Sequence, residues 1–119
     1  MTDELAFLYL EHGGDVNVAL TLAQTAKQQL PHSPVTTDAL GWAYYKIGST
    51  DSAVAELKDC VMKEPNNALF QYHLGMAYVA SGHLDVARTY LQKALKDFPN
   101  FPDAATAKST LDKISRPVR

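Results

Sequence analysis

The sequence predicts an all-α repeat fold, and three observations support this prediction. Two consecutive segments of 34 residues align with each other without a gap. Glycine and proline recur at fixed places in both segments, where they would end helices. No run of alternating β-branched residues is long enough to suggest a strand. At 119 residues, the chain has the length of a single domain with one continuous core.

The repeat is clearest between residues 34–67 and residues 68–101. Self-similarity at a fixed spacing is typical of solenoids, in which each unit buries its apolar face against the next. A shift of 34 residues gives ten identical pairs, which are Leu40/Leu74, Gly41/Gly75, Ala43/Ala77, Tyr44/Tyr78, Gly48/Gly82, Asp51/Asp85, Ala53/Ala87, Leu57/Leu91, Pro65/Pro99 and Asn66/Asn100.

A truncated first repeat precedes these two. Shifting back by another 34 residues aligns Gly14, Ala19 and Pro31 with a glycine, an alanine and a proline of the next repeat. The opening turn of this first repeat is missing. We therefore expect one domain over residues 1–119, with repeats at about 1–33, 34–67 and 68–101 and a capping helix at about 102–115.

Each repeat is predicted to hold two helices with marked ends. Ser33 before Pro34 suits a helix start, and Asn67 is placed to cap the next repeat in the same way. A glycine ends the first helix, where a left-handed residue is favoured, and a proline follows the second helix. We expect seven helices and no strand, with breaks near Gly14, Pro31, Gly48, Pro65, Gly82 and Pro99.

Small residues predict tight packing within each helix pair. Gly41 and Gly75 would let the second helix approach the first closely, and Ala53 and Ala87 would face them. After the last repeat, Pro102 is expected at a helix start. The side chains that then recur at helical spacing in the capping helix are Ala105, Lys108, Leu111 and Ile114.

Charge and composition exclude several function classes. The net charge is −2 and the pI about 6.0, which disfavours nucleic acid as a partner. No apolar run approaches the roughly 18 residues that cross a membrane. One cysteine, Cys60, allows no internal disulfide and fits a reducing compartment. The acidic start does not suit a secretory signal, so a chain complete as given would be cytoplasmic.

Chemistry-bearing motifs are not evident in the sequence. The four histidines, His12, His32, His73 and His83, lack metal-ligand spacing. No phosphate-binding loop follows a strand, and the acids form no evident pair in a pocket. The sequence therefore predicts no enzyme, no metal and no cofactor.

The repeated pattern Leu-Gly-x-x-Tyr-x-x-x-Gly-x-x-x-x-Ala with its closing proline resembles the tetratricopeptide repeat family. The resemblance covers about residues 3–101 and implies a right-handed superhelical solenoid. Cys60 stands where the family usually has alanine, and Ala6, Phe7 and Leu10 replace Leu, Gly and Tyr in the first repeat. The layout is also similar to the C-terminal region of longer bacterial repeat proteins.

The resemblance also implies a concave groove lined by the second, fifth, ninth and twelfth positions of each repeat. The groove residues that it implies are Glu4, Leu8 and Glu11, then Val35, Asp38, Trp42 and Tyr45, then Leu69, Tyr72, Met76 and Val79. We expect Trp42, Tyr45, Tyr72 and Met76 to be at least partly accessible, with Trp42 and Tyr72 as anchors. The alternative is that Trp42 and Tyr72 pack between neighbouring helices.

The predicted function is a protein–protein interaction module that binds a peptide segment or a helix in this groove. The acids Asp38 and Glu11 would favour a partner with an apolar anchor beside basic residues. The family's clamp for a C-terminal carboxylate is not implied, because its positions lack the required cations. Two alternatives remain. One is structural, either a segment of a longer solenoid or a scaffold that self-associates through its truncated first repeat, and the other is an RNA-binding helical repeat.

Overall fold

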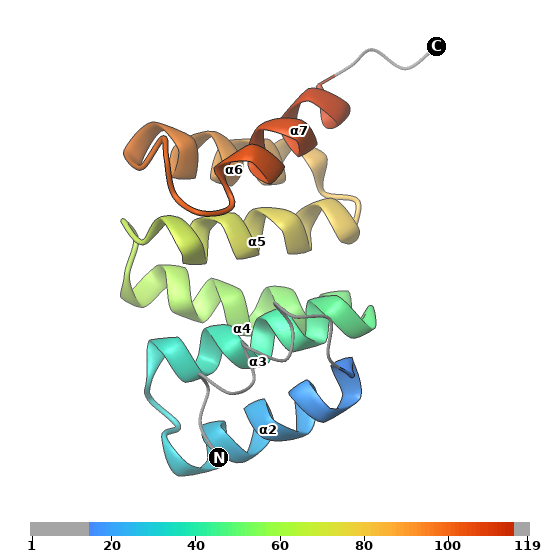
Figure 1. The fold of residues 1–119 in the computed structure, drawn as a ribbon, viewed down its shortest axis with the longest axis vertical. Helices are drawn as coiled ribbons and strands as arrows, with labels where there is room; N and C mark the ends of the chain where they lie inside the picture. The colour runs from blue at the N-terminus through green and yellow to red at the C-terminus, as the bar shows by residue number, and fades with distance from the viewer. Residues whose placement is uncertain (1–14, 116–119) are drawn as a thin grey trace.

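The computed structural model describes residues 15–115, and this part of the chain forms six helices and no strand. The helices stack in chain order along the long axis (Figure 1). The all-α prediction is therefore confirmed, while the helix expected before Gly14 lies outside the described residues. The helices are α2 (Val16–Gln29), α3 (Pro34–Ile47), α4 (Thr50–Lys63), α5 (Ala68–Ala80), α6 (Leu84–Asp97) and α7 (Ala104–Ile114).

Glycine ends the first helix of both complete repeats, as predicted. Gly48 has φ 88° and Gly82 has φ 84°, a left-handed conformation that costs glycine little. The amide after each glycine donates back to the helix, from Ser49 to the Tyr44 carbonyl and from His83 to the Tyr78 carbonyl, both at 2.9 Å. These bonds satisfy carbonyls that the helix end would leave unpaired.

The predicted N-caps are confirmed for α3 and α5. The Ser33 hydroxyl accepts a hydrogen bond from the Thr36 amide at 3.3 Å. Asn67 Oδ1 accepts one from the Phe70 amide at 3.1 Å. Each bond satisfies an amide of the first helical turn, so these two residues set where the repeats begin.

The prediction for the last helix is wrong in two details. Pro102 lies in a turn that the Ala104 amide closes by donating to the Phe101 carbonyl at 2.9 Å, and α7 begins after Asp103, whose carbonyl accepts the first helical bond from the Ala107 amide at 3.0 Å. Ala105 and Lys108 are exposed. The side of α7 that faces the stack instead carries Ala104, Ala107, Leu111 and Ile114.

Glycine also sets the distance within each helix pair. A Cβ on Gly41 would lie 2.6 Å from Leu57 Cγ, and a Cβ on Gly75 would lie 2.8 Å from Leu91 Cγ. Both leucines are fully buried. Any side chain at these glycines would therefore force α4 away from α3, or α6 away from α5.

The stack is held by contacts between consecutive helices and between first helices of neighbouring repeats. Each helix from α2 to α7 packs against the next, and α3 also contacts α5. The contact between α3 and α5 joins the first helices of the two complete repeats. This second kind of contact, from first helix to first helix, positions the candidate functional site.

Candidate protein-interaction surface

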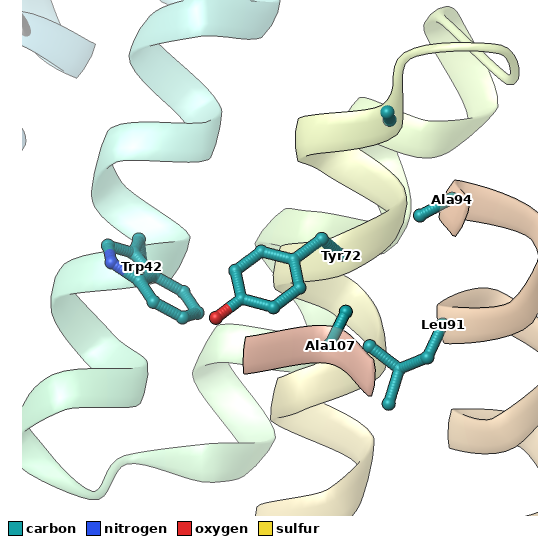
Figure 2. Close-up of a cluster of buried hydrophobic side chains, with 6 residues drawn as sticks. Trp42, Tyr72, Leu91, Ala94 and Ala107 are labelled. Atoms are coloured by element: carbon teal, nitrogen blue, oxygen red, sulfur yellow. The ribbon is translucent and has the colours of Figure 1, made fainter. Parts of the chain in front are cut away.

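The predicted anchors Trp42 and Tyr72 lie in one buried cluster that joins α3, α5, α6 and α7. We call it the Trp42 cluster, and its buried members are Trp42, Ala68, Tyr72, Leu91, Ala94 and Ala107. Figure 2 shows Tyr72 between Trp42 and the alanine of α7. The ring centroids of Trp42 and Tyr72 are 5.9 Å apart, and those of Tyr72 and Phe101 are 5.6 Å apart. Such distances are typical of stabilising aromatic pairs.

Trp42 is stacked between two further rings. The Tyr45 ring lies 4.4 Å from it on one helix turn, and the His73 ring lies 4.0 Å away on the neighbouring first helix. Lys46 Nζ lies 5.2 Å from the centroid of the Trp42 ring, within cation–π distance. These contacts enclose the indole on several sides, so the cluster is a well-packed support for the side chains above it.

A buried polar pair lies beside the indole. Asp38 and His73 are 0% and 3% exposed, and His73 Nδ1 lies 2.7 Å from Asp38 Oδ1 and 3.0 Å from Oδ2. Burial raises the pKa of the Asp38 carboxyl, and the nearby His73 ring opposes that rise. The pair therefore satisfies two buried polar groups across the α3–α5 contact, as buried polar groups require.

The structure corrects the accessibility expected for three groove residues. Trp42 is 7% and Tyr72 4% exposed, and Asp38 is fully buried. The reason is that Asp38 and Trp42 face α5, whose His73 and Tyr72 cover them, and that Tyr72 in turn packs against Phe101. The alternative interpretation, that Trp42 and Tyr72 pack between neighbouring helices, describes their place in the structure.

Other predicted groove residues remain partly open. Tyr45, Met76 and Val79 are partly exposed and pack against the Trp42 cluster. Burial raises the pKa of the Tyr45 hydroxyl, as expected for a ring that is half covered. Leu69 is 36% and Val35 47% exposed. The remaining predicted residues, Glu4, Leu8 and Glu11, lie outside the described residues.

We define the first-helix surface as the partly exposed side chains that rest on the Trp42 cluster from three successive first helices. They are Tyr45 on α3, Met76 and Val79 on α5, and Leu111 and Ile114 on α7. The two α7 residues were expected only to close the stack. The sequence showed that they recur at helical spacing, but it did not show that they would lie next to the groove positions.

Residues with other chemistry do not form a second site of a familiar kind. Among residues 15–115, no group of three or more His, Cys, Asp or Glu side chains is placed to hold a metal ion. Cys60 is buried, its thiol donates to the Pro34 carbonyl at 3.4 Å, and burial raises the pKa of that thiol. In the same part of the chain, the helices are too short or too polar to span a membrane.

Solved structures of similar fold include three that cover most of this chain. The first tetratricopeptide domain of human RPAP3 has 21% identity and a TM-score of 0.79 over 95% of this chain and 86% of that chain. The same figures apply to that domain of RPAP3 (Spaghetti) bound to an HSP90 peptide. An O-GlcNAc transferase mutant from Thermobaculum terrenum has 27% identity and a TM-score of 0.81, covering 92% of this chain but only 20% of that chain.

The sequence itself carries the family assignment. No curated protein matches the sequence. The tetratricopeptide repeat family profile matches residues 48–111, which is more than half of the chain. The matched range runs from the glycine that ends α3 to the last turns of α7. The chain therefore belongs to the tetratricopeptide repeat family.

Proposed function

We propose that this chain is a protein-interaction module that binds a segment of a partner protein on the first-helix surface. One observation carries the proposal. Five apolar side chains from three successive first helices stay partly exposed above a well-packed aromatic cluster. Apolar side chains held in place lose little conformational freedom on binding, which favours affinity. Among structures of similar fold, RPAP3 is bound to the HSP90 peptide SRMEEVD.

The chemistry of the bound segment would differ from that acidic peptide. Asp38 and His73, two positions that the family's carboxylate clamp would use, are buried against each other. Lys46 lies over the rings of Trp42 and Tyr45, and Arg88 donates to the Ile114 carbonyl at 3.1 Å, so both cations already have partners. We therefore propose a segment that binds mainly through apolar side chains, and we propose no catalytic role for the chain.

Peptide selection tests the proposal and does not require an identified partner. A random peptide library is selected on the wild-type chain, and the dissociation constant of the best peptide is measured for variants. Met76→Gln with Val79→Ser should weaken binding about thirtyfold, the effect of about 2 kcal/mol at a central contact. The matched control is Met62→Gln on α4, whose methionine is 77% exposed; this variant should bind as the wild type does.

Two results would contradict the proposal. One is equal affinity in the wild type, the double variant and the control, which would place the peptide elsewhere. The other is a library that yields no peptide while light scattering shows a concentration-dependent oligomer. That second result would favour the self-associating scaffold.

A further inference from the structure

A second candidate site lies where two loops meet at one edge of the stack. The loops that join α4 to α5 and α6 to α7 lie on the same side of the molecule (Figure 1). Between them is an open pocket of about 590 Å³. We call it the loop pocket, and its walls include Glu64, Pro65, Asn66, Leu69, Phe98 and Phe101. This volume falls within the range of about 300–1,000 Å³ that is typical of ligand-binding sites.

The apolar walls of the loop pocket break the symmetry of the repeat. The 34-residue shift pairs Phe98 with Glu64 and Phe101 with Asn67. Two polar residues of one loop are thus replaced by two phenylalanines in the next. Phe98 is 50% exposed although it is among the largest apolar side chains. Phe101 also packs against the Trp42 cluster, whereas the half-exposed Phe98 has no such structural role, since the preceding loop has Glu64 in its place.

One buried side chain links the two walls of the pocket. Gln71 on α5 is fully buried, and its Nε2 donates to the Pro65 carbonyl on one wall and to Asp97 Oδ2, at 3.4 Å, beside the other. Phe101 is held from behind by the Tyr72 ring. The pocket walls are therefore fixed before any ligand binds, which lowers the entropic cost of binding.

The charge at the rim indicates what would bind. Glu64 is exposed and accepts only a 3.3 Å hydrogen bond from Asn67 Nδ2, with no cation beside it among the described residues. Of the lysines at the ends of α4 and α6, Lys63 pairs with Asp59 at 3.1 Å and Lys93 with Asp97 at 3.0 Å, while the charge of Lys96 acts on Asp97. Apolar walls beside one unpaired carboxylate are complementary to an apolar side chain next to a basic one.

We infer that the loop pocket is a second protein-binding site, which holds an aromatic side chain of a partner segment next to an arginine or lysine. The aromatic ring packs between Leu69 and Phe98, and the basic group pairs with Glu64. Asn66 makes no side-chain hydrogen bond within residues 15–115 and lies at the rim, where its amide is placed to bond the backbone of the segment. The site shares no residue with the first-helix surface.

Short capped peptides test this inference directly. The probe is acetyl-Phe-Arg-amide, titrated into ¹⁵N-labelled protein and followed by amide chemical shifts. Saturable shifts are expected at Asn66, Leu69 and Phe98. The control probe acetyl-Phe-Gln-amide should bind about threefold more weakly, because an exposed ion pair contributes little. Acetyl-Ala-Arg-amide should bind about tenfold more weakly, because it lacks the ring.

Variants separate the pocket from the rest of the surface. Phe98→Asn should weaken binding of acetyl-Phe-Arg-amide about tenfold, and Glu64→Gln should weaken it about threefold. Leu84→Asn, which removes an exposed leucine outside the pocket, should leave the affinity unchanged. Circular dichroism confirms the fold of each variant. If Phe98→Asn does not fold, Glu64→Gln and the uncharged probe still decide the charge requirement.

Three outcomes would overturn the inference. They are no saturable shift at millimolar probe, equal affinity for the charged and uncharged probes, and shifts confined to Tyr45, Met76 and Val79. The last outcome would leave the proposed first-helix surface intact and remove only the loop pocket. Conversely, binding at the pocket by protein that carries Met76→Gln and Val79→Ser would show that the two sites act independently.

Discussion

α5 meets α3 and α7 differently: α5 and α3 pack directly on each other, whereas α5 and α7 are joined through side chains of the Trp42 cluster. In the first contact, Asp38 of α3 meets His73 of α5. The 34-residue shift replaces Asp38 by Tyr72 and His73 by Ala107. Tyr72 and Ala107 lie together in the Trp42 cluster (Figure 2). The same two repeat positions therefore hold Asp38 and His73 between α3 and α5, and Tyr72 and Ala107 in the cluster that joins α5 to α7.

This difference shows that the buried Asp38–His73 pair is not needed to form a first-helix contact. Burying two polar side chains costs desolvation free energy, and their mutual interaction offsets that cost only when both are present. Tyr72 and Ala107 include no carboxylate or imidazole, so their packing does not depend on keeping such a pair together. The α3–α5 contact is therefore the one that a single substitution damages most, and the following predictions test it from the largest expected effect to the smallest.

Asp38→Ala should give the largest loss of stability. It leaves the His73 ring buried without its carboxylate, and removing one member of a buried pair costs about 3–5 kcal/mol. The measurement is the free energy of unfolding from urea denaturation followed by circular dichroism. A loss below about 1 kcal/mol, typical of an ordinary substitution, would show that the pair contributes little.

The double variant Asp38→Tyr, His73→Ala sharpens the comparison, because it copies the α5–α7 contact into the α3–α5 contact. It removes the buried carboxylate and the buried imidazole together, and the polar group that it adds is a neutral hydroxyl, which costs less to bury than a charge. We expect it to be more stable than Asp38→Ala alone. The Trp42 ring, which stacks on His73 at 4.0 Å, would lose that contact, so full recovery is not expected. A double variant less stable than the single one would contradict the equivalence of the two contacts.

Much of the fold was predictable from sequence because its determinants are local. Helix ends depend on Gly48, Gly82, Ser33 and Asn67, whose backbone preferences act within a few residues. The close approach at Gly75 followed from the repeat alone. Repetition also made each local signal visible twice in one sequence.

The candidate site was less predictable because it depends on pairs that are distant in sequence. The repeat register placed Asp38 and Trp42 on the correct side of α3, but it did not predict how completely α5 covers them. The partner of Asp38 is His73, 35 residues away, at a position where the neighbouring repeats have Ala39 and Ala107. The loop pocket did have a signal, since Phe98 and Phe101 replace polar residues of the preceding repeat.

Gly75→Leu tests the contact within a helix pair, which both repeats share. A side chain at this position would collide with Leu91, so we expect a loss of about 1–3 kcal/mol or more. Gly41→Leu should cost a similar amount, because Leu57 is equally close. Ala80→Leu, at an exposed position of the same α5, is the matched control and should change stability by less than about 0.5 kcal/mol. Equal urea midpoints for Gly75→Leu and Ala80→Leu would refute the close packing.

The pH dependence of stability provides a third test of the polar contact. Because burial raises the pKa of Asp38 above its ordinary 3.8, the folded state holds this proton more tightly than the unfolded state does. The resulting contribution is complete below pH 3.8 and is lost as the pH rises through the raised pKa. Relative to Asp38→Asn, the wild type should therefore lose stability over this window, by at most about 1.4 kcal/mol per pH unit. A difference that stays constant or grows with pH would contradict this direction.

Asp97 should change the stability with pH in the opposite direction to Asp38 and by the smallest amount, since its carboxylate is exposed and its pKa is lowered. The main cause is the hydrogen bond from Lys93 Nζ at 3.0 Å, and the Gln71 amide adds to it. The contribution to stability is present above pH 3.8 and is lost as the pH falls through the lowered pKa. Lys93→Gln should move the pKa of Asp97 upward, toward 3.8, in a titration of the carboxyl ¹³C shift. Gln71→Leu should move it less. If Gln71→Leu gives the larger shift instead, the buried amide that links the walls of the loop pocket is the main partner of Asp97, and the exposed lysine is secondary.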